Sequence, residues 1–285
     1  ENGSIKGVVV NNNETIESEV VILAIGHSAR DTYKMLYNRG VTIIQKPFAI
    51  GVRVEHLQDM INKSQYGVDN CEGLPAAPYK LTYNTKSKRG VYSFCMCPGG
   101  CVVNASSEDK RLAVNGMSYS ARGGKNANSA IVTTITPNDF ESKHPLAGMY
   151  LQRELEEKAF NEGKGAIPVQ LYGDFVNNKI SHEFGNVIPD IKGKYSFANI
   201  KNVLPKYICD SIEEAMPYFG KKIQGFDNKD TVFAAIESRT SSPVRIIRED
   251  DFQSVFKGVY PCGEGAGYAG GITSAAIDGI KVFES

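Results

Sequence analysis

The sequence predicts a chain with α/β structure at both ends and an α+β region, mostly antiparallel and rich in strands, between them. Residues 20–40 pass from an apolar run, VVILAIG, through a polar turn into a sequence typical of a helix. Residues 258–279, GVYPCGEGAGYAGGITSAAIDG, repeat this order of strand, glycine-rich turn and helix. Most of the intervening sequence consists of short β-rich runs separated by Gly, Asn and Pro.

The composition is that of a soluble globular protein, with 41% hydrophobic and 22% charged residues among 285. Lys and Arg number 32, as do Asp and Glu. The chain therefore has no global basic field to attract an anionic membrane or nucleic acid, and nucleic acid is not the expected partner. No apolar run approaches the roughly 18 residues of a membrane span. The six cysteines are few, so we expect reduced thiols in a cytoplasmic protein and no disulfide framework.

The first forty residues predict two strands and a helix. IKGVVV and ESEVVILAIG are expected to be strands joined by an Asn-rich turn, the second buried on both faces of a parallel sheet. Ser28 is the expected N-cap of the helix that follows, and Gly40 stands where that helix would end. Because the chain enters strand-like sequence at once and lacks a starting Met, we expect that a preceding segment is missing.

Residues 46–227 are expected to form a separate substrate domain, β-rich with helices. Its strands are predicted by KPFAIGVRVEH, YKLTYNT, GVYSFCMC, CVVNASS, LAVNGMSYS and SAIVTTITP. Apolar residues at helical spacing predict helices over 146–163 and 206–220, whereas 165–206 shows no clear pattern. TVFAAIES and PVRI then predict two strands that meet at a polar turn. The other domain is expected to comprise residues 1–45 and 228–285.

The final glycine-rich segment has the features of an anion-binding turn. Glycine adopts backbone conformations closed to other residues, and the free amides and dipole at a helix N-terminus favour anions. Glu264 is expected to accept hydrogen bonds from sugar-like hydroxyls beside a pyrophosphate. The amides of Gly270, Gly271 and Ile272 are expected to face a ring carbonyl or an anion. The alternative is a tight strand–helix corner without a ligand, in which the glycines serve packing alone.

Several motifs resemble, in the same order, those of bacterial FAD-dependent dehydrogenases of uncertain substrate, within the glutathione-reductase-like FAD/NAD(P)-binding flavoproteins. These motifs are LAIGHSARDTYKMLYNRGV, KPFAIGVRVEH, LPAAPYKLTY, GVYSFCMCPGG, VVNASSEDKRLAVNGMSYSAR, NANSAI, ESRTSSPVRI and the final GEGAGYAGG. The resemblance covers nearly the whole chain. It implies an FAD-dependent oxidoreductase acting on a small-molecule substrate of unknown identity, with NAD(P)H as one candidate electron donor. The two ends of the chain would then be the remnant of an FAD-binding Rossmann-like domain.

The resemblance also implies which residues contact FAD. Those expected near the cofactor are Gly26, His27, Gly263, Glu264, Gly265, Gly270, Gly271 and Ile272. The sequence departs from the family because it does not include the N-terminal βαβ unit whose G-x-G-x-x-G turn holds the pyrophosphate. We therefore expect the C-terminal part of a flavoprotein, with weak or absent FAD affinity of its own.

Substrate-side residues are predicted at two places. ESRTSSP forms a polar turn that either lines a substrate or flavin pocket or is an ordinary surface turn; its candidates are Arg239, Thr240, Ser241 and Ser242. CMCPGGC offers Cys97 as a redox-active thiol, with ordinary buried thiols as the alternative. Strand alternation would place Cys95 on the same face as Cys97. Three cysteines at this spacing, without an evident fourth ligand, do not predict a metal site.

The remaining charged candidates have structural interpretations. Arg53 and Glu55 are expected to share one strand face and to form a cross-strand salt bridge. The isolated histidines are expected at the surface; they are His56, His144 and His182. Two alternative functions stay open, a non-catalytic binding module and a flavin-dependent enzyme that modifies RNA.

Overall fold

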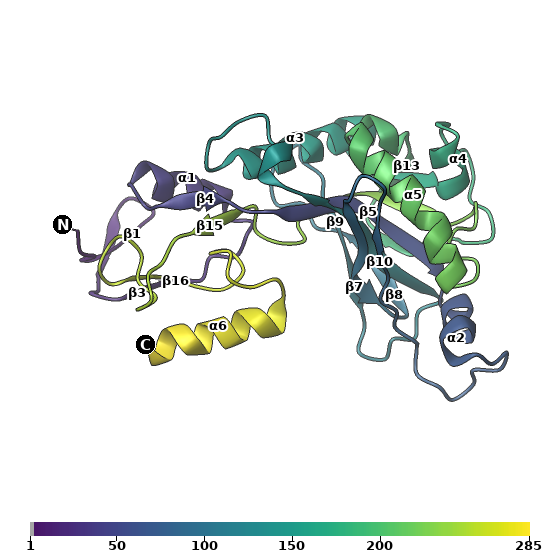
Figure 1. Cartoon of the computed structure of the whole chain (residues 1–285), viewed down its shortest axis with the longest axis horizontal. Coiled ribbons are helices and arrows are strands. Elements are labelled where there is room, and N and C mark those ends of the chain that lie inside the picture. Colours follow the sequence, from purple (N-terminus) through teal and green to yellow (C-terminus); the bar gives the residue numbers. More distant parts are fainter. Residues whose placement is uncertain (1–2) are drawn as a thin grey trace. The chain divides into compact units, whose positions relative to one another are not determined.

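The computed structural model describes residues 3–285 as a mixed α/β protein with two compact units (Figure 1). Unit 1 contains the described residues up to Phe48 together with Ile135–Leu151 and Arg239–Ser285. Unit 2 contains Ala49–Thr134 and Gln152–Ser238. Within residues 3–285, no helix combines the length and the apolarity needed to cross a lipid bilayer.

The strands at the start of unit 1 pair differently from the expected arrangement. β1 (Gly7–Val10) forms an antiparallel hairpin with β2 (Glu14–Glu17), and the Asn-rich turn between them has positive φ angles at Asn11 and Asn12. The apolar run instead supplies a third strand, β3 (Val21–Leu23), which pairs in parallel with β16 (Val259–Pro261). The prediction of two strands joined by the Asn-rich turn did not include β2, which forms a short local hairpin with β1. The expectation that the apolar run is buried on both faces was wrong for the described residues, because Val20 and Ile22 are 57% and 46% exposed.

The first helix of unit 1, α1 (Arg30–Asn38), begins later than expected. Its N-cap is Ala29, which makes no side-chain capping bond, so the prediction of Ser28 as N-cap was wrong. The Ser28 hydroxyl instead accepts a hydrogen bond from Arg239 Nη1 at 3.2 Å. Gly40 follows the helix end with φ of 86°, a left-handed conformation that suits glycine.

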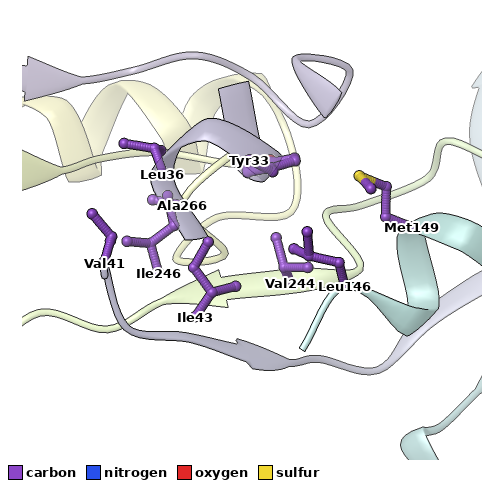
Figure 2. Packing of buried hydrophobic residues seen from close by; sticks show 9 residues of the cluster. All are labelled: Tyr33, Leu36, Val41, Ile43, Leu146, Met149, Val244, Ile246 and Ala266. Carbon is purple, nitrogen blue, oxygen red and sulfur yellow. The ribbon is translucent and has the colours of Figure 1, made fainter. Parts of the chain in front are cut away.

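The core of unit 1 joins segments that are far apart in the sequence. β4 (Ile43–Gln45) pairs antiparallel with β15 (Val244–Ile246), and α6 (Ile272–Glu284) ends the chain. Figure 2 shows the apolar side chains that meet between α1, these strands and the start of α3 (Ala147–Glu162). The buried residues are Tyr33, Leu36, Val41, Ile43, Leu146, Met149, Val244, Ile246 and Ala266.

Unit 2 is built on a seven-stranded sheet with the order β13-β11-β14-β5-β10-β7-β6. Its strands are β5 (Phe48–Leu57), β6 (Thr82–Asn84), β7 (Gly90–Cys97), β10 (Asn126–Ile135), β11 (Ile167–Leu171), β13 (Tyr195–Phe197) and β14 (Val232–Glu237). A second sheet has the order β12-β8-β9, with β8 (Gly100–Asn104), β9 (Val114–Ser118) and β12 (Ile191–Lys192). All the strands predicted in this region are present.

Helices complete unit 2. They are α2 (Gln58–Tyr66), most of α3, α4 (Tyr172–Val176) and α5 (Lys206–Lys222), with a single turn at Ile200–Asn202. Another single turn, Pro137–Asp139, lies in unit 1. The helical spacing read from the sequence predicted α5 well, since its expected apolar positions are buried: Ile208, Ile212, Ala215, Met216 and Phe219. Residues 165–206 contain β11, α4, β12 and β13, which are too short for a periodic pattern.

The units differ from the expected domain boundaries at three places. Residues 46–48 and 135–151 belong to unit 1, and 228–238 belong to unit 2. The last difference has a clear cause, because β14 pairs with β11 and β5 in the large sheet, while β15 pairs with β4. The polar turn between β14 and β15 therefore carries the chain from one unit to the other and does not close a hairpin.

Unit 2 buries an ionic network that the sequence did not reveal. Arg53 is 0% exposed, and its guanidinium binds Glu237 through two hydrogen bonds of 3.0 and 3.1 Å. Arg53 also donates to Asn115 at 2.9 Å and to Asn128 at 3.2 Å. The expected cross-strand salt bridge is thus present for Arg53, and Glu237 on the neighbouring strand β14 is its bidentate partner. Glu55 instead accepts hydrogen bonds from the Asn126 side chain and the Asp190 amide.

The expectation for His56 was also wrong, since its side chain is buried in unit 2. Nε2 lies 2.8 Å from the Phe226 carbonyl oxygen, and the two rings are 4.2 Å apart. Burial lowers the pKa of His56 to about 4, so the ring is neutral at pH 7 and Nε2 donates to the carbonyl. His182 is exposed and His144 is half-buried.

Glu55 gives unit 2 a dependence on pH. Burial raises the pKa of its carboxyl from 4.5 to about 7, although the Asp190 backbone amide and the Asn126 side chain donate hydrogen bonds to Oε2. A carboxyl with a raised pKa in the folded state destabilises that state once it ionises. We therefore expect stability to fall by on the order of 3 kcal/mol from this group as pH rises from about 4.5 to 7.

Glu55→Gln tests this dependence. The neutral amide oxygen keeps an acceptor for Asp190 and Asn126, so urea unfolding of the variant will lose the decline in this pH window. Asp59→Asn, at an exposed position of the neighbouring α2, will keep the wild-type slope. Equal slopes for wild type and Glu55→Gln would contradict the assignment.

Candidate functional site

Two glycine turns of unit 1 lie against each other. The first glycine turn (Gly26–Ser28) follows β3, and the second glycine turn (Gly263–Gly267) follows its parallel partner β16. A Cβ on Gly265 would lie 2.5–2.7 Å from the backbone of Gly26, closer than side chains approach a backbone. Gly26 and Gly263 have positive φ angles of 67° and 73°. The close contact between the turns therefore requires glycine at position 265, because a side chain there would clash with the backbone of Gly26.

Tyr33 of α1 holds the two turns together. Its hydroxyl lies 2.7 Å from the Gly265 carbonyl oxygen, to which it donates, and 3.1 Å from that of Gly26. Ser242 adds a second hydroxyl, 3.4 Å from Tyr33 and 3.2 Å from the Gly265 oxygen. Burial raises the pKa of Tyr33 to about 12, so the phenol keeps its proton and remains a donor.

Tyr33→Phe will lower the free energy of unfolding by about 1–2 kcal/mol, because the Gly265 carbonyl loses its nearest donor in a buried site. Tyr37→Phe is the matched control, because it removes a hydroxyl from a more exposed tyrosine of the same helix. Denaturant unfolding measures both. Equal losses of stability in the two variants would contradict the role of the Tyr33 hydroxyl in holding the two glycine turns together.

His27 and Glu264 connect the turns on their more open side. His27 Nδ1 lies 2.7 Å from Glu264 Oε1, with side chains 17% and 24% exposed. Since an ionised carboxylate can only accept, Nδ1 is the donor. The pair therefore orients a carboxylate whose Oε2 makes no hydrogen bond to the described residues and is available to a hydroxyl donor.

A salt bridge supports the second glycine turn from behind. Arg248 donates to both carboxylate oxygens of Asp278 at 2.7 and 3.0 Å, and its guanidinium stacks 3.7 Å from the ring centroid of Tyr268. Asp278 also accepts from the amide of Gly263 at 2.7 Å. Burial alone would raise the pKa of Asp278, but the hydrogen bonds from Arg248 and Gly263 lower it below its usual value.

The N-terminus of α6 is open. Its N-cap is Gly271, which has no side chain to cap the helix, and a Cβ at Gly270 or Gly271 would meet nothing within 4 Å. Ile272 is 93% exposed. The Gly270 amide donates to Ser274 Oγ at 3.3 Å. The amides of the first helical turn have no acceptor four residues earlier within the helix, so they offer donors at the positive end of the helix dipole.

The polar turn Arg239–Ser242 adjoins this region through two of its four candidates. Arg239 reaches the first glycine turn at Ser28, and Ser242 is buried between Gly265 and Val244. Thr240 is buried and Ser241 half-buried. The geometry gives Ser242 a structural role, because its hydroxyl is committed to backbone oxygens.

Cys97 belongs to unit 2, while the other candidate residues belong to unit 1. A register shift in the β7–β10 pairing falls between Cys97 and Phe94, and Cys95 has a φ of 44°. This irregularity breaks the alternation, so the expectation that Cys95 and Cys97 share a face was wrong: Cys95 is exposed and Cys97 half-buried. Burial raises the pKa of the Cys97 thiol, and Arg53 opposes that rise only in part.

Three residues of this site were missed from the sequence. Tyr33 stands three residues before Leu36 in α1 and resembles an ordinary core position. Arg248 and Asp278 are thirty positions apart, and no local pattern pairs them. The one available signal was an acidic residue within the small-residue run AAIDG, where a buried charge needs a partner.

Comparison with known proteins adds the family. Residues 47–240 match the sequence profile of a family described as FAD-dependent protein, C-terminal domain-like. The chain belongs to this family. It is also 52% identical over 287 residues to an uncharacterised protein of Clostridium beijerinckii, covering 99% of this chain and 54% of that relative. The chain thus spans about half the length of the relative it matches.

Membership of the FAD-dependent family confirms the coarser part of the resemblance. Neither comparison names the glutathione-reductase-like superfamily, which stays a prediction. The matched segment coincides largely with unit 2 and includes Cys97, Arg239 and Thr240. The glycine turns and the start of α6 lie outside the matched segment, so the family match does not assign FAD binding to them.

Proposed function

We propose that the chain is part of an FAD-dependent oxidoreductase and that unit 1 contributes to its FAD site. The observation that carries the proposal is the open N-terminus of α6 next to two interlocked glycine turns. In this proposal, the β3–α1 and β16–α6 segments are the remnant of a Rossmann-like domain comprising residues 1–45 and 228–285. We propose a small molecule as the substrate. The protein that acts on it would be about as long as the C. beijerinckii relative.

The residues present fit the needs of FAD. The uncapped amides at the start of α6 would donate to an anionic or carbonyl edge of the flavin, and the absence of side chains at Gly270 and Gly271 leaves room for its approach. Glu264, oriented by His27, would accept from a ribityl or ribose hydroxyl. Gly26, Gly263 and Gly265 would form the protein surface against which FAD lies.

Bound FAD would supply hydride- or electron-transfer chemistry. The dipole of α6 would favour negative charge that accumulates near its N-terminus. His27 would hold the Glu264 carboxylate in place through the 2.7 Å contact. Arg239, Thr240 and Ser241 are the proposed substrate-side groups, and Cys97 is a proposed thiol of the same kind. NAD(P)H as electron donor stays a prediction from the sequence.

Gly271→Glu tests the position of FAD. Gly271 has an extended φ of 171° that any residue adopts, and its Cβ meets open space, so the variant will fold. An acidic N-cap suits the helix dipole but repels an anion, and we expect FAD affinity to fall by about tenfold or more. Flavin fluorescence during an FAD titration measures this.

Gly271→Gln is the matched control, since it has the same size without the charge. We expect its FAD affinity to lie between those of wild type and Gly271→Glu. The proposal fails if FAD binds neither the wild-type chain nor the full-length C. beijerinckii relative at millimolar concentration, or if Glu and Gln at this position have the same effect.

A further inference from the structure

The antiparallel pair β4–β15 in unit 1 has a core face and an outer face. The core face carries Ile43, Val244 and Ile246 (Figure 2). Side chains alternate along a strand, so Ile44 and its register partner Arg245 lie on the outer face. Lys46 follows two positions after Ile44, and its amide continues the ladder by donating to the Pro243 carbonyl at 3.0 Å. The outer face therefore brings together two cations and Ile44, which is 45% exposed.

Neither of these two cations forms an ion pair within residues 3–285. Lys46 is half-buried, and its ammonium makes a single hydrogen bond to the described residues, a long one of 3.4 Å to the Pro47 carbonyl. Arg245 is also half-buried and donates Nε and Nη2 to the Gly267 carbonyl at 3.3 and 3.1 Å. Its Nη1 makes no hydrogen bond to the described residues. Cations withdrawn from water are normally paired with an anion, so this pair is suited to an anionic ligand.

The second glycine turn places these cations beside Glu264. A Cβ on Gly267 would lie 2.6 Å from the Val244 oxygen and 2.9 Å from the Arg245 Cα, so the end of the turn packs directly on β15. Burial lowers the pKa of the Lys46 ammonium, Arg245 lowers it further, and Glu264 acts in the opposite direction. The two cations and the Glu264 carboxylate thus share one electrostatic environment, in which positive charge is in excess by a single unit.

We propose that Lys46 and Arg245 bind the carboxylate of a small organic acid, and that this acid is the substrate. A single excess positive charge suits a monoanionic carboxylate better than a phosphate dianion, which Glu264 would repel. Lys46 and the free Nη1 of Arg245 supply the donors, and the exposed Ile44 side chain is available to an apolar part of the acid. The role as substrate rests on the FAD site proposed above, whereas binding of the carboxylate does not.

Reductive methylation of the chain without FAD, followed for each lysine by mass spectrometry, measures access to the Lys46 amine. The probe is butyrate, a carboxylate with a short apolar chain. We expect about 100 mM butyrate to slow methylation of Lys46 about fivefold or more relative to sodium chloride of the same ionic strength, because a bound carboxylate keeps the amine protonated and covered. Inorganic phosphate will protect Lys46 less. Lys281, an exposed lysine of α6, will react at the same rate in all three salts.

Arg245→Gln tests the second cation. We expect butyrate to slow methylation of Lys46 in this variant by less than about twofold, because half of the positive charge and the Nη1 donor are gone. Arg245→Lys restores the charge and will recover part of the protection. The matched control is Lys281→Gln, which removes an exposed cation of the same unit and will keep the protection seen in wild type.

The proposal is overturned if butyrate protects Lys46 no better than chloride, if phosphate protects it more than butyrate, or if Arg245→Gln keeps full protection. FAD titrations with and without butyrate distinguish a substrate site from a cofactor site. We expect the Kd for FAD to change less than about twofold, because the two ligands bind together. Competition between butyrate and FAD would overturn the substrate role, since the cations would then serve the cofactor. Protection of Lys46 is measured without FAD and the Gly271 variants report on FAD alone, so failure of the FAD site and failure of the carboxylate site are distinguishable.

Discussion

Glu237→Gln will lower the free energy of unfolding by about 3–5 kcal/mol, the largest single effect we expect. The variant keeps the shape of the side chain but removes its charge, which leaves the guanidinium of Arg53 without a counter-ion. Arg53 is 0% exposed, so water cannot replace the carboxylate. Asn115, Asn128 and the Cys95 carbonyl accept hydrogen bonds from Arg53 but carry no charge.

Glu157→Gln is the control for this prediction. Glu157 binds Arg111 at 3.1 Å, but its side chain is 53% exposed. Exposed pairs contribute about 0–1 kcal/mol, so urea unfolding should separate the two variants clearly. Equal effects would show that burial of the Arg53–Glu237 pair does not determine its contribution.

Asp278→Asn will lower the free energy of unfolding by about 3 kcal/mol, because Arg248 and Asp278 are each mostly buried. Because the pKa of Asp278 is lowered in the folded state, the stability that this pair contributes depends on pH. A carboxyl with a lowered folded-state pKa stabilises the protein above its unfolded-state pKa, and that stability is lost as pH falls through the folded-state pKa. The free energy of unfolding of wild type will therefore fall in acid, and that of Asp278→Asn will fall less because the variant has no carboxylate to protonate at this position.

The same substitution should weaken FAD binding, because the Gly263 amide loses the carboxylate that fixes the second glycine turn. Asp210→Asn, which breaks an exposed pair with Lys206, is the control and should change neither stability nor FAD affinity appreciably. The structural role of Asp278 would be contradicted if Asp278→Asn matched this control from pH 3 to 7.

Local patterns predicted elements whose interactions lie within a few residues. The spacing of Ile208, Ile212 and Phe219 specified α5, and short β-rich runs bounded by Gly, Asn and Pro specified β5 and β10. The strand–turn–helix order of residues 258–284 was equally clear, because the glycine-rich run marked the turn. The structure gives the reason for one of these glycines, since only glycine fits where Gly265 meets Gly26.

Interactions between distant residues could not be predicted in this way. Arg53 and Glu237 are 184 positions apart, and nothing in GVRVEH shows that a later strand supplies the carboxylate. His56 gave no sign of burial because its partner is the backbone of Phe226. The exposure of Ile277, Ile280 and Phe283 in α6 was hidden for the same reason, since helical spacing identifies an apolar face but not what it contacts.

Hydrogen exchange of the wild-type chain with and without FAD tests the central claim most directly. The account predicts that saturating FAD slows exchange of the amides from Gly263 to Thr273, which comprise the second glycine turn and the start of α6. Protection confined to unit 2, or no protection at these amides, would contradict the claim that unit 1 contributes to the FAD site.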